Sequence, residues 1–427
     1  MRIWLINAGE PTPIDEDRFR LLRMGILAQL AADEGHDVVW WSSTFFHFTK
    51  RQRFESDQSI ELGTNYRINF VHAPPYAKHV SLARIRNHFR LGRGFASWAR
   101  RESVPDVILT SLPILELCGA AVRYGRNHSV PTVVDVRDLW PDIMLDLMPG
   151  WTRVVGRLAL APYFNLAHRA CSGATAIWGN TEEFVRWGLR CGRRQRTSLD
   201  RHFPFGYVPL ALSSDETAEA NRFWNAQGVD PDPHVPVACF FGAINHQFDF
   251  DTVLEAARQV QAARRMQFVF CGEGISTARY RQATCENPDV LFPGWVNAKQ
   301  IWSLMARSSF GLAPYVENQG FVNSLSNKPI EYLAGGLPIL CSLSQGPLFR
   351  LVTQEKCGVA YEGSASKLSR AILGILDSPR NYESLAANAR RLFSERYEAA
   401  RVYGGMLSQL KALAANRSAS YSPARAA

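Results

Sequence analysis

Short apolar runs of strand length alternate with amphipathic patterns along the whole chain, which is typical of βα units and of a parallel sheet covered by helices. Six such runs in the first half are expected to be strands, at residues 3–7, 38–41, 68–71, 107–110, 132–136 and 174–178. Six more follow in the second half, at residues 237–241, 267–271, 290–293, 310–313, 338–341 and 358–361. The pattern therefore predicts an α/β protein with two doubly wound parallel sheets in tandem.

Helical stretches separate these runs. Residues 18–33 place Leu22, Ile26 and Leu30 on one stripe, and a second helix is expected from about Asp251. The pattern starts afresh after a Pro-containing segment near residue 207. The predicted parts are an N-terminal domain 1–207, a C-terminal domain 208–385, C-terminal helices 386–415 that cross back to the N-terminal domain, and a disordered tail 416–427. Ligands are expected in the cleft between the domains, at the carboxyl ends of strands.

The composition is that of an ordinary globular protein, with 46% hydrophobic and 20% charged residues, and it excludes a collagen-like or wholly disordered chain. The net charge of +9 is uneven, because residues 1–210 hold 27 basic and 20 acidic side chains, +7 in all, and the rest adds +2. A basic first half predicts an anionic partner, such as a membrane surface, a phosphate or a nucleic acid. No nucleic-acid-binding motif is recognisable, so we do not expect nucleic acid as the partner.

The eight cysteines are scattered, and none stands at the spacing of a zinc site or a disulfide framework, which favours a reduced, cytosolic compartment. The opening MRIWLINAGEP breaks at Gly9, too early for a signal peptide, and no later run is long enough to span a bilayer. We therefore expect a cytoplasmic protein that contacts the inner face of the cell membrane peripherally at most.

The most informative stretch is NSLSNKPIEYLAGGLPIL, residues 323–340. It opens a helix at about Asn327 and ends it at Gly335-Gly336, before the next strand. Lys328 stands in the first turn, where a cation is unfavourable for the helix dipole unless it faces an anion. Glu331 follows one turn later and is placed to accept hydrogen bonds from the hydroxyls of a ribose. The alternative, an ordinary βα unit with an exposed Lys and Glu, is equally compatible with this helix taken alone.

This stretch resembles the donor-binding helix of the retaining glycosyltransferases of family 4, the group 1 type with the two-domain GT-B fold. Glu331 and the turn at 335–339 match the second half of the family pattern, while Asn323 stands where its first Glu would be. A subset of the family has S-K-x-x-E-Y instead, and NKPIEY at 327–332 is similar to it. The resemblance implies transfer of a sugar, with retention, from a nucleoside diphosphate sugar to a lipid-linked or cell-surface glycan precursor.

Other segments match the family in order and spacing: GHDV at 35–38, DVRDLWPD at 135–142, FGA at 241–243, FCGEG at 270–274 and LFPGWV at 291–296. By this resemblance the donor is bound by glycines at strand ends, by a loop against the base and by the start of the helix, at Gly9, Gly242, Gly272, Gly274, Trp295, Val296, Asn323, Ser324, Leu325, Ser326, Asn327, Lys328 and Glu331. The basic pair that usually follows the Gly242 position is absent, since NHQ stands at 245–247. Lys328 is therefore expected to meet the phosphate charge.

The DVRDLWPD loop and the first strand end hold the candidate catalytic residues Asp138, Arg137 and Glu10. Retaining transfer on this fold, as the resemblance implies, needs no obvious enzyme nucleophile, so the protein positions both substrates and stabilises the departing diphosphate. Asp138 would orient or deprotonate the acceptor hydroxyl, and Arg137 would bind an anionic acceptor or pair with Asp135 or Asp138. A structural Arg–Asp turn is an equally good interpretation, and Glu10 is either a sugar contact or an exposed loop acid.

Residues 84–101 contain six arginines and no acid. Flanked by Leu82, Ile85 and Phe89, they predict either a helix on an anionic membrane face or, the interpretation we favour, a packed helix with a solvated basic face. The segment FFHFTKRQR at 45–53 is expected on the same acceptor-side surface.

We therefore expect a GT-B glycosyltransferase that needs no cofactor and no metal, since a helix N-terminus can take the place of a metal at the diphosphate. Two alternatives stay open: a non-hydrolysing nucleotide-sugar epimerase, and a catalytically inactive nucleotide-sugar-binding protein, which Asn323 and the missing basic pair would suit. A dehydrogenase is a weaker interpretation, because GEG at 272–274 lacks the third glycine of the dinucleotide motif.

Overall fold

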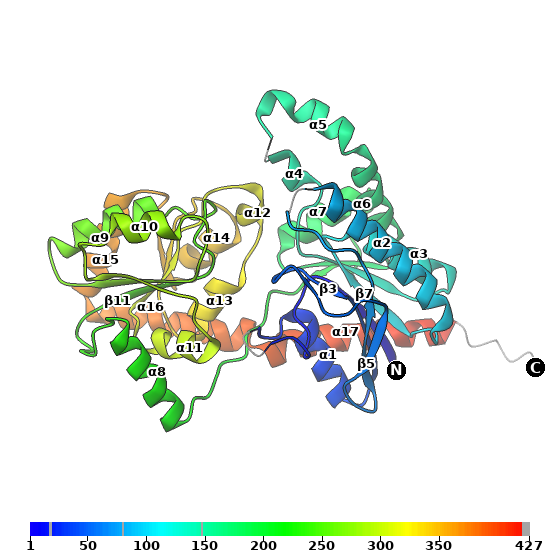
Figure 1. Ribbon diagram of the computed structural model, residues 1–427, viewed down its shortest axis with the longest axis horizontal. Helices are drawn as coiled ribbons and strands as arrows, with labels where there is room; N and C mark the ends of the chain where they lie inside the picture. The colour runs from blue at the N-terminus through cyan, green and yellow to red at the C-terminus, as the bar shows by residue number, and fades with distance from the viewer. Residues whose placement is uncertain (17–18, 79–80, 147, 421–427) are drawn as a thin grey trace, which may run out of the picture. The chain divides into compact units, whose positions relative to one another are not determined.

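The structure is a computed structural model that describes residues 1–420 except 17–18, 79–80 and 147. The chain divides into two compact units (Figure 1). The first unit comprises Met1–Pro204 together with the chain from Ala400 onward, and the second unit is Phe205–Ala399. The first crossing between the units thus lies close to residue 207, where the sequence pattern starts afresh.

The first unit is built on a sheet of eight strands in the order β10-β9-β8-β7-β1-β2-β6-β5. Six parallel strands correspond to the predicted ones: β1 (Arg2–Ile6), β2 (Asp37–Ser43), β6 (Tyr66–Val71), β7 (Val107–Ser111), β8 (Thr132–Val136) and β9 (Ala176–Gly179). The edge strands β5 (Gln58–Glu61) and β10 (Arg201–His202) were not predicted, because they are short and polar. β5 runs antiparallel to β6, so the prediction of a purely parallel sheet is wrong at this edge.

Helices α2, α3, α6 and α7 pack side by side in this unit. The helices of the first unit are α1 (Arg23–Asp33), α2 (Leu82–Trp98), α3 (Leu115–Asn127), α4 (Asp142–Asp146), α5 (Arg153–Ala159), α6 (Ala161–Gly173), α7 (Glu182–Gly192) and α17 (Ala399–Ser420). A small hairpin of β3 (Phe45–Phe46) and β4 (Arg51–Gln52) lies within the predicted aromatic and basic segment 45–53. The helices of one layer cover the side chains of Trp4 and Trp41, which belong to one buried cluster with Phe95 and Tyr124.

Helix α1 begins at Arg23, later than the predicted start at residue 18, which lies outside the described residues. A tertiary contact caps the helix at this start. The Glu10 carboxylate accepts a hydrogen bond from the Met24 N–H at 2.9 Å, and so caps the first turn from another loop. A contact between residues 14 positions apart leaves no mark in the local pattern of the helix.

The second unit has six parallel strands in the order β13-β12-β11-β14-β15-β16. They correspond to the six predicted runs: β11 (Val237–Phe241), β12 (Gln267–Cys271), β13 (Val290–Gly294), β14 (Phe310–Ala313), β15 (Ile339–Cys341) and β16 (Gly358–Ala360). The helices are α8 (Ser214–Ala226), α9 (Phe250–Gln261), α10 (Thr277–Ala283), α11 (Ala298–Arg307), α12 (Gln319–Asn323), α13 (Asn327–Ala334), α14 (Gly346–Gln354), α15 (Ala365–Leu376) and α16 (Pro379–Leu392). The prediction of two doubly wound sheets is therefore confirmed.

Both sheets reverse their strand order at one place, between β1 and β7 in the first unit and between β11 and β14 in the second. Ligands of open α/β sheets bind outside the carboxyl ends of the strands at such a reversal. The loops after β1 and β11 hold Gly9 and Gly242, two of the predicted site residues. The topology therefore directs attention to these loops.

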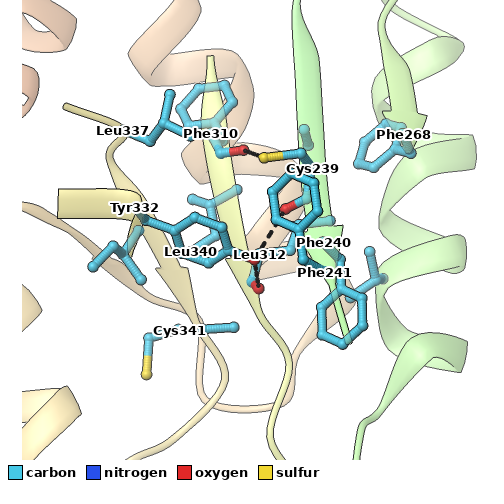
Figure 2. Close-up of a cluster of buried hydrophobic side chains, with 14 of the residues drawn as sticks. Cys239, Phe240, Phe241, Phe268, Phe310, Leu312, Tyr332, Leu337, Leu340 and Cys341 are labelled. Atoms are coloured by element: carbon cyan, nitrogen blue, oxygen red, sulfur yellow. Dashed lines mark hydrogen bonds between the residues drawn. The ribbon is translucent and has the colours of Figure 1, made fainter. Parts of the chain in front are cut away.

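Helix α13 is anchored to the sheet by Tyr332, which Figure 2 shows within the buried cluster next to β11 and β14. Its hydroxyl donates to the carbonyl oxygens of Leu312 at 3.0 Å and Cys239 at 3.4 Å. A Cβ at Gly311 would lie 2.3 Å from the tyrosine ring, so only glycine leaves room for this packing. The contact fixes α13, and with it Lys328 and Glu331, relative to the ends of the strands.

The two chain segments that link the units pair with each other inside the second unit. Tyr207 N–H donates to the Tyr397 carbonyl at 2.9 Å, and Ala399 N–H donates to the Tyr207 carbonyl at 3.0 Å. Of the predicted C-terminal helices, α16 stays with the second unit, while α17 belongs to the first. Helix α17 continues to Ser420, so the prediction of a disordered tail is wrong for residues 416–420. The remainder of that tail, 421–427, lies outside the described residues.

Candidate active site

The loop after β1 is a tight turn held by Asn7. The Asn7 side-chain oxygen accepts hydrogen bonds from the backbone N–H groups of Gly9 at 2.9 Å and Glu10 at 3.1 Å. Both Asn7 and Glu10 are buried, so the interpretation of Glu10 as an exposed loop acid is wrong. The turn points the Glu10 carboxylate inward, toward the loop after β8.

Four buried or nearly buried charged side chains meet there, two acids and two arginines. Glu10 pairs with Arg137, whose Nε lies 4.0 Å from the Asp135 carboxylate. Asp135 in turn accepts from Arg23 Nη1 at 3.0 Å, and both of these side chains are fully buried. Burial alone would lower the pKa of Arg137, but the charges of Glu10 and Asp135 outweigh it and raise the pKa. The candidate Arg137 thus pairs internally, with Glu10 and Asp135.

Asp138 lines a cavity of about 280 Å³ in the first unit. The cavity walls come from the loops after β1 and β7 and from α2, and they include Asn7, Gly9, Ser111, Arg84, Asn87 and His88. Burial raises the pKa of Asp138 to about 6, although a hydrogen bond from the Leu139 N–H at 2.8 Å and the Arg84 charge lower it. A carboxylate with a pKa close to neutrality is suited to accept a proton at physiological pH.

His88 and Arg84 are cavity residues that sequence analysis did not single out. His88 is buried, and burial together with the charges of Arg84 and His47 lowers its pKa to about 3, so the imidazole is neutral. Arg84 Nε lies 3.4 Å from His88 Nε2. The spacing of these residues could have indicated their position. Arg84, Asn87 and His88 share one helical stripe with Leu91, which is the spacing of an inward face. The sequence pattern was interpreted only as a basic surface.

In the second unit, three predicted glycines bring two loops into contact. Gly242 and Gly272 have φ angles of 146° and 135°, a region that side-chain-bearing residues avoid. A Cβ at Gly272 would lie 1.9 Å from the Gly242 carbonyl oxygen, and a Cβ at Gly274 would lie 2.2 Å from the Ile244 carbonyl oxygen. The loops after β11 and β12 therefore pack backbone against backbone. The N–H groups of the three glycines hold the loops in place, because they donate to the carbonyl oxygens of Cys271 and Gly294 and to Thr277 Oγ1.

Lys328 lies directly beside the first of these loops. A Cβ at Gly242 would meet Lys328 Cε at 2.4 Å and Nζ at 2.9 Å, so the glycine makes room for the lysine. The ammonium also stands over the ring of Phe248 at 4.8 Å and that of Phe240 at 5.6 Å. Two predicted parts of the donor site, the Gly242 loop and the start of α13, are thus brought together by the fold.

The remaining predicted donor residues differ in exposure. Glu331 and Leu325 are buried, and Ser326 shares a hydrogen bond of 2.5 Å with the hydroxyl of Tyr315. Asn323 donates to the Gln319 carbonyl at 2.7 Å within α12, a helix that sequence analysis did not predict. Ser324 and Asn327, which flank Leu325 and Ser326 in the sequence, are half-buried. Val296 is buried, whereas the Trp295 side chain is 53% exposed.

A larger cavity of about 530 Å³ in the second unit contains none of the predicted donor residues. Four acids line it, Asp249, Asp251, Glu317 and Glu362, against the single arginine Arg279. An anionic diphosphate is repelled by such a wall. The predicted donor site and this cavity are therefore different places.

Known proteins resemble the chain in fold. Residues 235–378, within the second unit, match a family described as glycosyl transferases group 1. Sucrose-phosphate synthase from Thermosynechococcus elongatus superposes with a TM-score of 0.71 at 14% identity, over 97% of this chain and 99% of that one. Anabaena HepE in complex with UDP-glucose gives 0.62 at 14% identity, over 96% and 100%. WaaG, a glycosyltransferase involved in lipopolysaccharide biosynthesis, gives 0.57 at 13% identity, over 96% and 99%. The fold is GT-B.

The GT-B fold accounts for the repeated strand order of the two units. Together with the sequence match it supports the group 1 glycosyltransferase family, while the narrower assignment to family 4 stays a prediction. No curated protein sequence matches the chain. Within the described residues, no helix is both long and apolar enough to cross a bilayer.

Proposed function

We propose that this GT-B protein transfers a sugar from a nucleoside diphosphate sugar to an acceptor hydroxyl. The observation that carries the proposal is the position of Lys328, a full positive charge in the first turn of α13 and next to the Gly242 backbone. Helix N-terminal N–H groups, a lysine and a close-packed glycine loop together suit a diphosphate. The match of residues 235–378 to group 1 glycosyl transferases supports the same conclusion.

The donor is held by the second unit in this proposal. Lys328 and the N–H groups of Ser326 and Asn327 bind the diphosphate, and the buried Glu331 accepts hydrogen bonds from the ribose hydroxyls. Gly242, Gly272 and Gly274 let the two strand-end loops pack tightly beside Lys328, and the nucleotide lies against these loops in the proposal. Trp295, Val296, Asn323, Ser324 and Leu325 complete the donor contacts that the resemblance implies.

The acceptor is held by the first unit, in the cavity beside Asp138. The bond between the anomeric carbon and the diphosphate breaks, and its electron pair leaves with the diphosphate. The acceptor oxygen bonds to the same face of that carbon, so configuration is retained, and Asp138 takes the acceptor proton. Arg137 and Glu10 position the Asp138 loop through their ion pair.

We further propose that the acceptor carries negative charge, as a lipid-linked or cell-surface glycan precursor does. Arg84 lines the Asp138 cavity, and residues 84–101 add further arginines with no acid among them. The same proposal includes membership of the family 4 subset. It also places the protein at the inner face of the cell membrane, where such an acceptor would be found.

A thermal-shift screen of nucleoside diphosphate sugars, starting with UDP-glucose, tests the donor part. A bound donor should raise the melting temperature of the wild type, and Glu331→Gln should lose most of that rise because the ribose contacts weaken. Glu255→Gln, an exposed acid on α9 in the same unit, is the matched control and should keep the full rise. A donor that stabilises Glu331→Gln as much as the wild type would refute the ribose role. The anomeric configuration of the product, measured by NMR, tests retention.

A further inference from the structure

Helix α5 carries an apolar stripe that the protein leaves in solvent. Val154, Val155 and Leu158 lie on α5, and Trp151 lies in the 3-10 turn Gly150–Thr152 that leads directly into it. The four follow at i, i+3, i+4 and i+7, the spacing of one helical face. Their side chains are 85%, 73%, 68% and 72% exposed. Single exposed apolar residues are ordinary, but four large ones on a single stripe mark an interaction surface.

The opposite face of α5 already has its packing partners. Gly156 is the buried residue of the helix, and a Cβ there would meet Met148 Sδ at 2.3 Å and Leu145 Cδ2 at 3.2 Å. Figure 1 shows α5 standing out from the sheet of the first unit, next to α4. The helix is thus held in place through its inner face, and its outward stripe is not needed for the core of the unit.

Positive charge accompanies the stripe. Arg153 and Arg157 lie on the flank of the stripe at i, i+4, and both are exposed. The sequence contains no acid between Asp146 and Glu182. An apolar stripe with a tryptophan and flanking arginines is typical of a helix that lies in the interface of an anionic membrane.

Helix α2 repeats the pattern on its outward face. Leu82, Ile85 and Phe89 are exposed at i, i+3 and i+7, and Arg86 and Arg90 stand beside them. The inward face of the same helix, through Arg84, Asn87 and His88, lines the Asp138 cavity. The Arg84 guanidinium also stacks over the Trp140 ring at 4.6 Å, just before α4. Helix α2 is therefore joined through Arg84 to the loop that carries Asp138 and leads into α4.

We propose that α5, together with the outward face of α2, docks the protein on an anionic lipid surface by inserting Trp151, Val154, Val155 and Leu158 between the headgroups. Self-association through α5 is the less favoured arrangement, because two copies would bring Arg153 and Arg157 against the same arginines with no acid to offset them. The proposal deepens the proposed function, since it names a membrane as the source of the acceptor, but the binding itself does not depend on catalysis.

Cosedimentation of the full chain with phosphatidylcholine vesicles, with and without phosphatidylglycerol and at low and high salt, tests the proposal. The wild type should bind the anionic vesicles and release as salt rises. The double variant Trp151→Ser/Leu158→Ser should bind at least about tenfold more weakly, because it removes two of the inserting side chains. Ile275→Ser is the matched control, since Ile275 is 82% exposed but lies in the second unit, and its vesicle binding should equal that of the wild type.

Melting temperatures verify that the double variant folds, and its thermal shift with UDP-glucose separates this inference from the proposed function. The inference is supported if the double variant no longer binds vesicles but still shows the wild-type rise in melting temperature with UDP-glucose. The inference is overturned if the wild type ignores anionic vesicles, if the double variant binds them as tightly, or if light scattering shows a dimer that the double variant dissolves. If the protein binds vesicles but no nucleotide sugar, the proposed function is refuted, whereas the inference of a membrane-binding surface is supported.

Discussion

Replacing Asp138 by asparagine should stabilise the protein while it stops turnover. Burial raises the pKa of this carboxyl from 3.8 to about 6, so the folded state holds the proton more tightly than the unfolded chain does. Stability contributed in this way is present at low pH and is lost as pH rises through the interval from 3.8 to about 6. At pH 7 the wild type therefore bears the full penalty of a buried charge, and Asp138→Asn does not.

The structure sets the size of the effect. A rise in pKa from 3.8 to about 6 corresponds to at most about 3 kcal/mol of unfolding free energy. Asp138 is half-buried by exposure, so we expect a gain of about 1 to 3 kcal/mol at pH 7. Asparagine can still accept the Leu139 N–H hydrogen bond, so the loop should keep its shape. The lowered pKa of His88 has the opposite pH dependence, because it makes the folded state less stable as pH falls from 6.5 to about 3. This contribution is the same in the wild type and in Asp138→Asn, so it cancels in the comparison.

Urea denaturation of both proteins between pH 4 and pH 8 measures this difference. The stability advantage of Asp138→Asn should shrink steadily as pH falls toward 4. Transfer by the variant should fall by at least about a hundredfold, and the wild-type kcat/KM should fall below an apparent pKa near 6. An advantage that is absent at pH 7, or one independent of pH, would show that the carboxylate carries no burial penalty. A loss of turnover below tenfold would remove Asp138 from the proton transfer.

Three further variants address the rest of the site. Gly272→Ala should destabilise the second unit by about 2 to 4 kcal/mol in urea denaturation, because its Cβ would lie 1.9 Å from the Gly242 oxygen at a φ of 135°. Lys328→Gln should weaken binding of a nucleoside diphosphate by about tenfold or more in calorimetry, since one charge-assisted contact is lost. Arg23→Met should lower the unfolding free energy by about 3 to 5 kcal/mol, because the buried Asp135 loses its closest cation.

Each of these variants has a control variant with the same type of substitution at a position outside the site. Gly374→Ala, with nothing near its Cβ, should stabilise by about 0.5 to 1 kcal/mol. Lys299→Gln and Arg258→Met alter exposed ion pairs and should leave donor binding and the melting temperature unchanged. Equal effects in a variant and its control would contradict the site-specific explanation.

The parallel strands could be predicted because a strand buried on both faces is a continuous apolar run. VACFF at 237–241 and QFVFC at 267–271 have this form, and both begin and end where predicted. The antiparallel edge strand β5 reads QSIE and faces solvent, so its sequence does not differ from that of a loop. The outward stripe of α5 was missed for the opposite reason, since its valines and leucine look like core residues until a structure shows no core above them.

Local patterns predicted the helix at Asn327 and the position of Lys328 in its first turn, because both depend on adjacent residues. They could not predict which charges pair. Arg23 and Asp135 are 112 positions apart, and only the strand order brings α1 to the end of β8. The same applies to His88, whose place beside Asp138 follows from the way α2 crosses the end of the sheet.

The return of the last helix to the first unit affects how the protein is made. Helix α17 contributes buried side chains to that unit, among them Val402, Tyr403, Met406 and Leu407. During synthesis the ribosome finishes the second unit before it makes this helix, so the first unit, although begun first, stays incomplete until the chain has been extended beyond residue 400. A stop codon ahead of residue 400 would therefore spare the second unit, whose chain is whole, and expose the apolar surface of the first.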